Sequence, residues 1–222
     1  MLLAVDTSTR MLGAALYDGT RVYGEMVWYS QDHHTVELAP VIQALMTRVG
    51  VPLEELKVLA VALGPGSFTG LRIGLALIKG MAFSLHLPVV GVPTLDFLAA
   101  AQPARDLPLL AVLQAGRGRL AVGEYHLEKG RWSPKGDAEI LNGQSLAQKI
   151  HHQTLICGEL TSEERQILAR KRKNVILASP AQSLRRPAFL AEAAWRRWKS
   201  GQTDNPAVLS PIYLHVGEPI PA

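Results

Sequence analysis

One glycine-rich stretch of this chain combines residues that can bind an anion. It reads Gly64-Pro65-Gly66-Ser67-Phe68-Thr69-Gly70-Leu71-Arg72-Ile73-Gly74 and lies between an apolar run that predicts a buried strand and an apolar segment that predicts a helix. Glycines let the backbone approach a partner closely, and the N–H groups at a helix start can hold an anion. Ser67 or Thr69 is expected to cap this helix. The spacing matches neither GxxxxGK[ST] nor GxGxxG, so a tight turn with a cap is the alternative to an anion site.

Three other sets of residues have reactive or metal-binding side chains, but each lacks the setting that its chemistry requires. His33, His34 and Glu37 lie within one turn of a predicted helix and could ligate zinc, yet their order is not HExxH. Cys157 falls in an apolar strand, where a thiol behaves as a small hydrophobic side chain. Ser67 lacks the GxSxG context of a nucleophilic serine. We therefore expect no metal site and no nucleophilic catalysis.

The composition predicts a folded protein of a reducing compartment. The 222 residues are 48% apolar and 19% charged, which fits one large domain or two small ones and argues against disorder. A single cysteine fits the cytoplasm. We expect no secretory signal, because no basic start with an apolar core opens the sequence. We also expect no membrane span, because no charge-free apolar run reaches about 18 residues.

Positive charge is concentrated in the second half of the chain. Residues 1–105 carry 7 Lys and Arg against 8 Asp and Glu, whereas residues 106–222 carry 16 against 11, so the net charges are −1 and +5. The cations cluster at Arg170-Lys171-Arg172-Lys173, at Arg185-Arg186 and at Arg196-Arg197-Lys199. Such clusters either contact phosphates or form solvated helix faces.

The order of elements predicts an α/β protein with two similar halves. Three strands at 2–5, 12–17 and 22–28 are followed by a helix that Ser30 or Asp32 caps and that ends near Val49. Three antiparallel strands and a helix are the first half of a ribonuclease-H-like or actin-like layer. The segment at 103–108 is a plausible boundary. The second half repeats the pattern less cleanly, with strands at 109–113, 119–126, 155–158 and 174–177 and helices at 145–151, 161–171 and 187–199.

The predicted helix at 71–85 is apolar nearly all round, which indicates burial on more than one side. Gly70 and Gly74, four residues apart, would leave room for the backbone of a neighbouring helix. One side is expected to pack on the sheet. The other packs either on the second domain of this chain or on a partner subunit.

The string GPGSFTGLRIG resembles the signature of the bacterial TsaB (YeaZ) family, which takes part in making threonylcarbamoyladenosine in tRNA. The opening segment 2–9, the segment Asp32–Pro40 and the late Pro211-Ile212-Tyr213-Leu214 resemble the same family. The resemblance is close over about the first 100 residues. It implies a two-lobed actin-like ATPase (ribonuclease-H-like) fold with mixed sheets flanked by helices. Residues 1–105 would form the N-terminal lobe and residues 106–222 a smaller C-terminal lobe, with the final helix packing back on the N-terminal lobe.

The resemblance also implies a vestigial nucleotide site. In actin-like ATPases the turn after the first strand is a phosphate loop, and Asp6 and Ser8 stand in that place, where Asp6 could hold a magnesium water and Ser8 could meet a phosphate. The residues of this implied site are Asp6, Ser8, Gly64, Gly66, Ser67 and Thr69. The family's second loop usually carries an aspartate where this chain has Gln114, and a neutral amide cannot supply charge to a divalent ion. The expectation is no cofactor, with ATP or ADP only at the level of a complex.

As a family member, the chain would be a cytoplasmic, non-catalytic partner of the TsaD transferase, together with the ATPase TsaE. It would form a homodimer when alone and reach tRNA indirectly through the complex, with no membrane contact. The implied partner surface lies on two helices of the N-terminal lobe. Its residues are Val36, Leu38, Ile42, Leu45, Gly70, Gly74, Leu77 and Met81.

Two other classes of function fit parts of the sequence. A nucleotide-hydrolysing enzyme would use Asp6, Ser8 and the glycine loop. A direct RNA-binding module would use the basic second half.

Overall fold

The computed structural model describes residues 1–31 and 33–214, and the chain divides into two compact units. The first unit comprises Met1–Phe97 and Arg185–Ile212, and the second comprises Leu98–Leu184 with the described residues Tyr213 and Leu214. The first unit is therefore discontinuous in sequence: its first segment ends at Phe97, and its second segment contains the last helix. Asp32, one of the two predicted helix caps, lies outside the described residues.

The first unit contains a five-stranded sheet in the order β3-β2-β1-β4-β5. β1 and β4 lie at its centre and are buried along their whole length, which explains their continuous apolar sequences. β1 pairs antiparallel with β2, as expected for the start of this layer, and it pairs parallel with β4. The strands are β1 (Leu2–Asp6), β2 (Met11–Tyr17), β3 (Val22–Tyr29), β4 (Val58–Ala62) and β5 (Val89–Val92).

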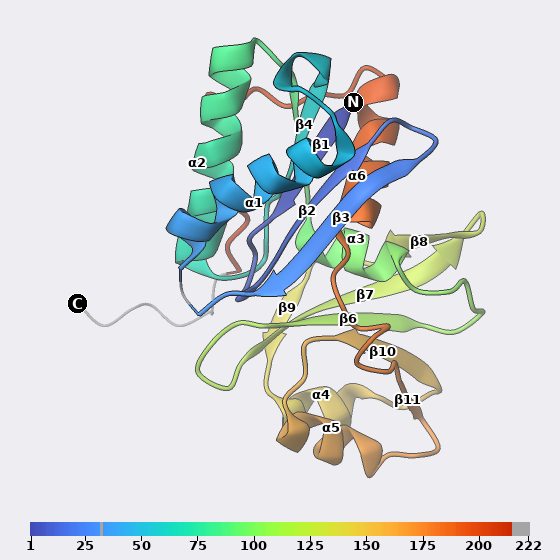
Figure 1. Ribbon diagram of the computed structural model, residues 1–222. Helices are drawn as coiled ribbons and strands as arrows, with labels where there is room; N and C mark the ends of the chain where they lie inside the picture. The colour runs from blue at the N-terminus through green and yellow to red at the C-terminus, as the bar shows by residue number, and fades with distance from the viewer. Residues whose placement is uncertain (32, 215–222) are drawn as a thin grey trace. The chain divides into compact units, whose positions relative to one another are not determined.

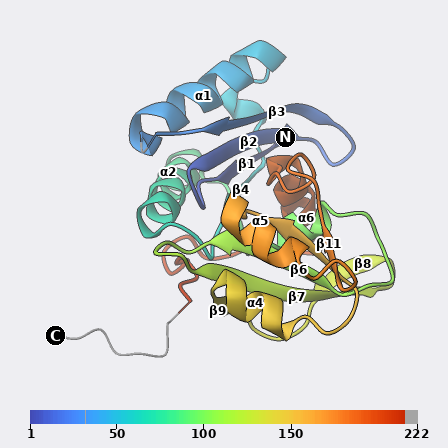
Figure 2. The ribbon, with the colours of Figure 1, turned by 90° about the horizontal axis from the view of Figure 1, so that it is seen from below.

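Helices cover both faces of this sheet (Figure 1 and Figure 2). They can do so because alternate residues of a strand point to opposite sides. Leu3 and Val5 belong to a core with the helices α1 (His34–Val49) and α2 (Phe68–Leu85). Leu2 and Ala4 face the opposite way, toward a core with the helix α6 (Pro187–Lys199). α6 packs directly on β1 and β2. The short helices of this region are η1 (Leu53–Glu55) and α3 (Thr94–Ala100), which straddles the boundary between the units.

The 18-residue helix α2 is long and apolar enough to cross a membrane by length and composition. Length and composition alone are weak evidence for a membrane span, because the core helix of a folded domain can have the same length and composition. α2 packs on β4 and buries Leu71, Leu75, Ile78 and Ala82. The side chain of Ser67 caps it by accepting a hydrogen bond from Gly70 N, so one of the two predicted caps is confirmed.

The second unit contains a sheet in the order β11-β10-β6-β7-β8, with β9 also pairing with β7. Its strands β6, β10 and β11 run parallel, and β7 and β8 are antiparallel. The helices α4 (Gly143–Lys149) and α5 (Ser162–Ala169) close an apolar core with the sheet. The strands are β6 (Leu109–Gln114), β7 (Leu120–Glu128), β8 (Arg131–Pro134), β9 (Glu139–Leu141), β10 (Thr154–Gly158) and β11 (Val175–Leu177).

Candidate functional site

The carboxylate of Asp6, at the end of β1, is held by a buried arginine. Arg185 Nε donates to Asp6 Oδ2 at 2.7 Å, and the two side chains are only 1% and 2% exposed. Arg185 Nη2 also donates to Thr9 Oγ1 at 2.8 Å and to Met11 O at 2.6 Å. The other oxygen of Asp6 accepts a hydrogen bond from Ser8 N at 2.9 Å. The guanidinium of Arg185 therefore binds the carboxylate to which the family resemblance assigns a magnesium-bound water.

The turn after β1 and the glycine loop pack directly on one another. Ser67 N donates to Ser8 O at 2.6 Å, and a Cβ on Gly66 would clash with the same carbonyl. Ser8 Oγ shares a 2.7 Å hydrogen bond with Thr94 Oγ1, which also accepts from Gly64 N at 3.0 Å. The two segments that the family resemblance assigns to one site therefore lie in contact. The polar groups of Ser8 and Gly64 are already paired within the chain.

Gly70 and Gly74 allow α2 to approach the turn after β1. A Cβ on Gly70 would clash with Thr7 O, and one on Gly74 would clash with Thr7 Oγ1. Thr7 Oγ1 donates to Gly70 O at 2.7 Å, which fixes the helix at this distance. Both glycines are buried within the first unit. The expectation that they leave room for a neighbouring helix is corrected: Thr7 of the same unit fills this space, with its carbonyl at Gly70 and its side chain at Gly74.

The predicted partner residues of α1 divide by exposure. Leu38, Ile42 and Leu45 are 2–5% exposed and belong to the core with β1 and β2, so they contribute little surface in this structure. Val36 is 67% exposed. The apolar stripe of α1 covers the sheet, so the residues of that stripe are buried, whereas Val36 lies off the stripe and is exposed.

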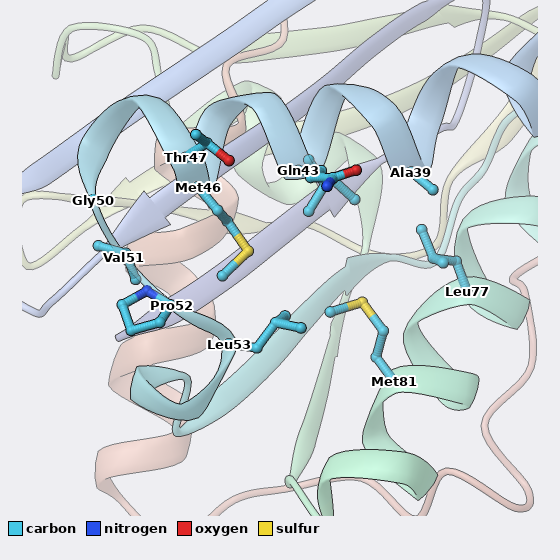
Figure 3. Close-up of a pocket in the computed structure, with 11 residues that line it drawn as sticks. Ala39, Gln43, Met46, Thr47, Gly50, Val51, Pro52, Leu53, Leu77 and Met81 are labelled. Atoms are coloured by element: carbon cyan, nitrogen blue, oxygen red, sulfur yellow. The ribbon is translucent and has the colours of Figure 1, made fainter.

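An apolar groove lies between α1 and α2 (Figure 3). Its volume is about 730 Å³. Met46 from α1 and Met81 from α2 extend into the space between the helices, and Leu77 lies beside Met81 on the same helix. Leu77 and Met81, both half-buried, are the predicted partner residues that line it without being fully buried. We call this feature the α1–α2 groove, and its lining is completed by Ala39, Ile42, Gln43, Thr47, Gly50, Val51, Pro52 and Leu53.

The residues considered for metal binding are used in other ways. Within 1–31 and 33–214, no three His, Cys, Asp or Glu side chains gather in an arrangement that could hold a metal ion. His34 Nε2 lies 3.1 Å from Thr9 O, whereas Glu37 accepts a hydrogen bond from Trp28 Nε1 at 2.9 Å. That hydrogen bond lowers the pKa of Glu37 below its ordinary value. His33 Nδ1 is 3.9 Å from Glu37.

In the second unit, burial raises the pKa of the Cys157 thiol to about 12. A thiolate is the nucleophilic form of cysteine, so Cys157 has no reactive form near neutral pH. This agrees with its place in an apolar strand.

Gln114, at the end of β6, donates to a buried carboxylate. Its Nε2 lies 2.7 Å from Glu164 Oε2 and 3.3 Å from Glu159 O. Glu164 is 7% exposed and also accepts from Thr161 N in a capping box at the start of α5. An aspartate at position 114 would place a second negative charge beside Glu164. The amide is therefore matched to its surroundings.

Sequence reasoning missed Arg185, Thr94 and Glu164 as the partners of Asp6, Ser8 and Gln114. All three are distant in sequence from the residues that they contact. Arg185 was visible only as part of a basic pair, which gave no sign that one arginine is buried and its neighbour Arg186 is half-exposed.

Comparison with known proteins identifies the family. Residues 28–178 match the family model described as TsaD, tRNA N6-adenosine threonylcarbamoyltransferase. The chain is 31% identical to the tRNA threonylcarbamoyladenosine biosynthesis protein TsaB of Bacillus subtilis, over 75% of this chain and 74% of the relative. It is 30% identical to TsaB of Escherichia coli, over 67% and 65%. The solved structure of YeaZ from Pseudomonas aeruginosa superposes with a TM-score of 0.79 at 27% identity, covering 96% of this chain and 99% of that one.

Proposed function

Because the chain belongs to the TsaB (YeaZ) family, whose members act in tRNA threonylcarbamoyladenosine biosynthesis, we propose that it is a non-catalytic subunit that binds and supports the TsaD transferase. The complex would modify tRNAs that read codons beginning with A. The observation that carries this proposal is the α1–α2 groove.

The α1–α2 groove has the features of a protein-binding surface. It is apolar, it lies between two helices, and the exposed Val36 lies on one of them. A helix-bearing partner fits such a groove, because ridges of one helix pack between the ridges of others. The match of residues 28–178 to the TsaD family model supports a partner of related fold, which would present a similar pair of helices.

The contacts of Asp6 and Gln114 support a subunit without its own catalysis. A Mg²⁺-nucleotide at Asp6 would have to displace Arg185 from a fully buried ion pair. The amide at Gln114 gives a divalent ion no charge. We therefore propose that this chain holds no cofactor, and that ATP or ADP acts only at the level of the complex.

The remaining partners are those that the family resemblance implies. A TsaE-type ATPase would join the complex, which would bring the tRNA to the transferase. Without TsaD the exposed α1–α2 groove would favour a homodimer, because its apolar lining is then left in water.

The test is co-elution of the full-length chain with TsaD after a change in the α1–α2 groove. Met81→Lys places a charge where apolar contact is proposed, so binding is expected to weaken about tenfold or more. Tyr29→Lys is the matched control, since Tyr29 is 59% exposed on β3 and does not line the groove. Equal co-elution of both variants and the unaltered chain would refute the surface. Circular dichroism would show that each variant is folded.

A further inference from the structure

The loops that lead into three strands of the second unit lie at one edge of its sheet. β6, β10 and β11 are parallel, so they begin at the same edge. Two backbone hydrogen bonds join their approaches, from Thr154 N to Asn174 O and from Leu155 N to Pro108 O, both 2.9 Å long. Asn174 Nδ2 also donates to His151 O at 3.0 Å. Because β7 runs antiparallel to β6 and extends past its start, the turn between β7 and β8 projects from this edge too.

This edge carries a strong excess of positive charge. Its exposed acidic side chains are Asp106, Glu128 and Asp137, the last of which lines a pocket with Pro108 and Thr154. Six of its seven cations are exposed and Lys171 is half-buried. None of the seven makes an ion pair within the described part of the chain. We call these cations the basic edge: Arg105, Lys129, Arg131, Arg170, Lys171, Arg172 and Lys173.

The other two cationic clusters of the sequence are different, because their arginines pair with carboxylates of the same unit. Arg185 is paired with Asp6, and Arg186 Nη2 lies 2.6 Å from Glu25 Oε2. In the third cluster Arg197 Nη2 lies 3.3 Å from Asp204 Oδ1. Of the three clusters, only the one at 170–173 consists wholly of cations that no carboxylate neutralises.

The C-terminal end of α5 accounts for part of this charge. Cations near a helix C-terminus are stabilised by the helix dipole within the last turn. Arg170 and Lys171 immediately follow α5 and fit that role. Arg172, Lys173 and the cations of the two neighbouring loops lie beyond it, and mutual repulsion among them favours a polyanionic partner.

We propose that the basic edge of the second unit contacts the phosphate backbone of RNA directly. This goes beyond the proposed function, in which tRNA is reached through the complex. The contacts would be to phosphates rather than to bases, because no exposed Phe, Tyr or Trp side chain lies among these cations in the described chain. They would therefore add affinity without sequence preference.

An anionic membrane surface is the competing polyanion, and the distribution of apolar side chains argues against it. A membrane-bound surface combines cations with exposed apolar residues that enter the lipid. Every large apolar side chain exposed among the described residues belongs to the first unit, including Val36, Phe68 and Phe83. The basic edge has no such anchor in the described chain.

The test is binding of unmodified tRNA by the full-length chain, measured by fluorescence anisotropy over a series of salt concentrations. In the variant with Arg172→Ala and Lys173→Ala, the slope of log affinity against log salt is expected to fall by about two, one for each lost phosphate contact. The matched control is Arg196→Ala with Lys199→Ala, which removes two exposed cations from α6 and should leave the slope unchanged.

Three results would overturn the proposal. They are no tRNA binding by the unaltered chain at low salt, equal slopes in the unaltered chain and in the Arg172/Lys173 variant, and binding to phosphatidylserine vesicles in place of tRNA. Co-elution with TsaD should be the same for the unaltered chain and both variants. That readout separates the RNA contact from the proposed function, since a failure of the α1–α2 groove would appear there and not in the salt slope.

Discussion

The first strand of each unit ends on a polar side chain, and the partners of these two side chains have opposite charges. In the first unit β1 ends on the acid Asp6, which is paired with the cation of Arg185. In the second unit β6 ends on the neutral Gln114, whose amide donates to the acid Glu164. A nucleotide site would need these groups available to a metal or phosphate. Here each one is satisfied by a partner from a distant part of its own unit.

The largest effect is expected from breaking the ion pair of the first unit. Arg185→Met leaves the carboxylate of Asp6 buried without its cation, which should lower the free energy of unfolding by about 3–5 kcal/mol. Urea unfolding at neutral pH measures this loss.

Arg186→Met is the control for that experiment. Arg186 is 51% exposed and its partner Glu25 is 15% exposed, so this partly exposed pair should contribute less than the buried one, about 1 kcal/mol. Similar losses of stability in the two variants would contradict a larger contribution of the buried Arg185–Asp6 pair. Adding Asp6→Asn to Arg185→Met should recover part of the loss, because the buried charge is then removed.

A smaller effect on stability is expected from giving β6 an acidic end like that of β1. Gln114→Asp removes the N–H that Glu164 accepts and adds a negative charge beside it, which should cost about 1–3 kcal/mol near neutral pH. Two adjacent carboxylates raise the pKa of one of them, so the lost stability should return as the pH falls and that group becomes protonated.

Gln153→Asp makes the same chemical change at an exposed residue and should alter stability by less than about 0.5 kcal/mol. If Gln114→Asp changed stability as little as Gln153→Asp, the hydrogen bond from Gln114 to Glu164 would not contribute measurably to stability.

The smallest effect concerns a half-buried carboxylate of the first unit, Glu37. Its pKa is lowered chiefly by the hydrogen bond from Trp28, so Trp28→Phe should raise that pKa toward the ordinary value. Because the folded pKa is depressed, the stabilisation is present above the unfolded pKa and is lost as the pH falls through the folded pKa. An NMR titration of Glu37 measures the shift. Tyr29→Phe should leave the titration unchanged, and an unchanged titration in Trp28→Phe would exclude Trp28 as the cause.

Much of the fold could be predicted from the sequence, because its elements have clear local signals. The continuous apolar runs of β1 and β4 and the long apolar helix α2 stand within a few residues of their predicted ends. β8 and β9 were not predicted. Each has only three or four residues, and neither contains a fully buried side chain, so no hydrophobic periodicity marks them.

The candidate site could be predicted only in part. The turn after β1 and the glycine loop, which the family resemblance assigns to one site, lie in contact because both follow parallel central strands of one sheet. Their partners Arg185 and Thr94 come from residues far along the chain, and no spacing rule connects them. The burial of Leu38, Ile42 and Leu45 shows the same limit, because helical periodicity identifies an apolar stripe without saying what covers it.

The most direct test of the account is nucleoside mass spectrometry of tRNA from cells depleted of this chain and supplied with variants. We expect threonylcarbamoyladenosine to disappear on depletion, to return with the unaltered chain or Tyr29→Lys, and to remain low with folded Met81→Lys. An unchanged level on depletion would contradict the proposed function of this chain. Full restoration by Met81→Lys would contradict the role of the α1–α2 groove.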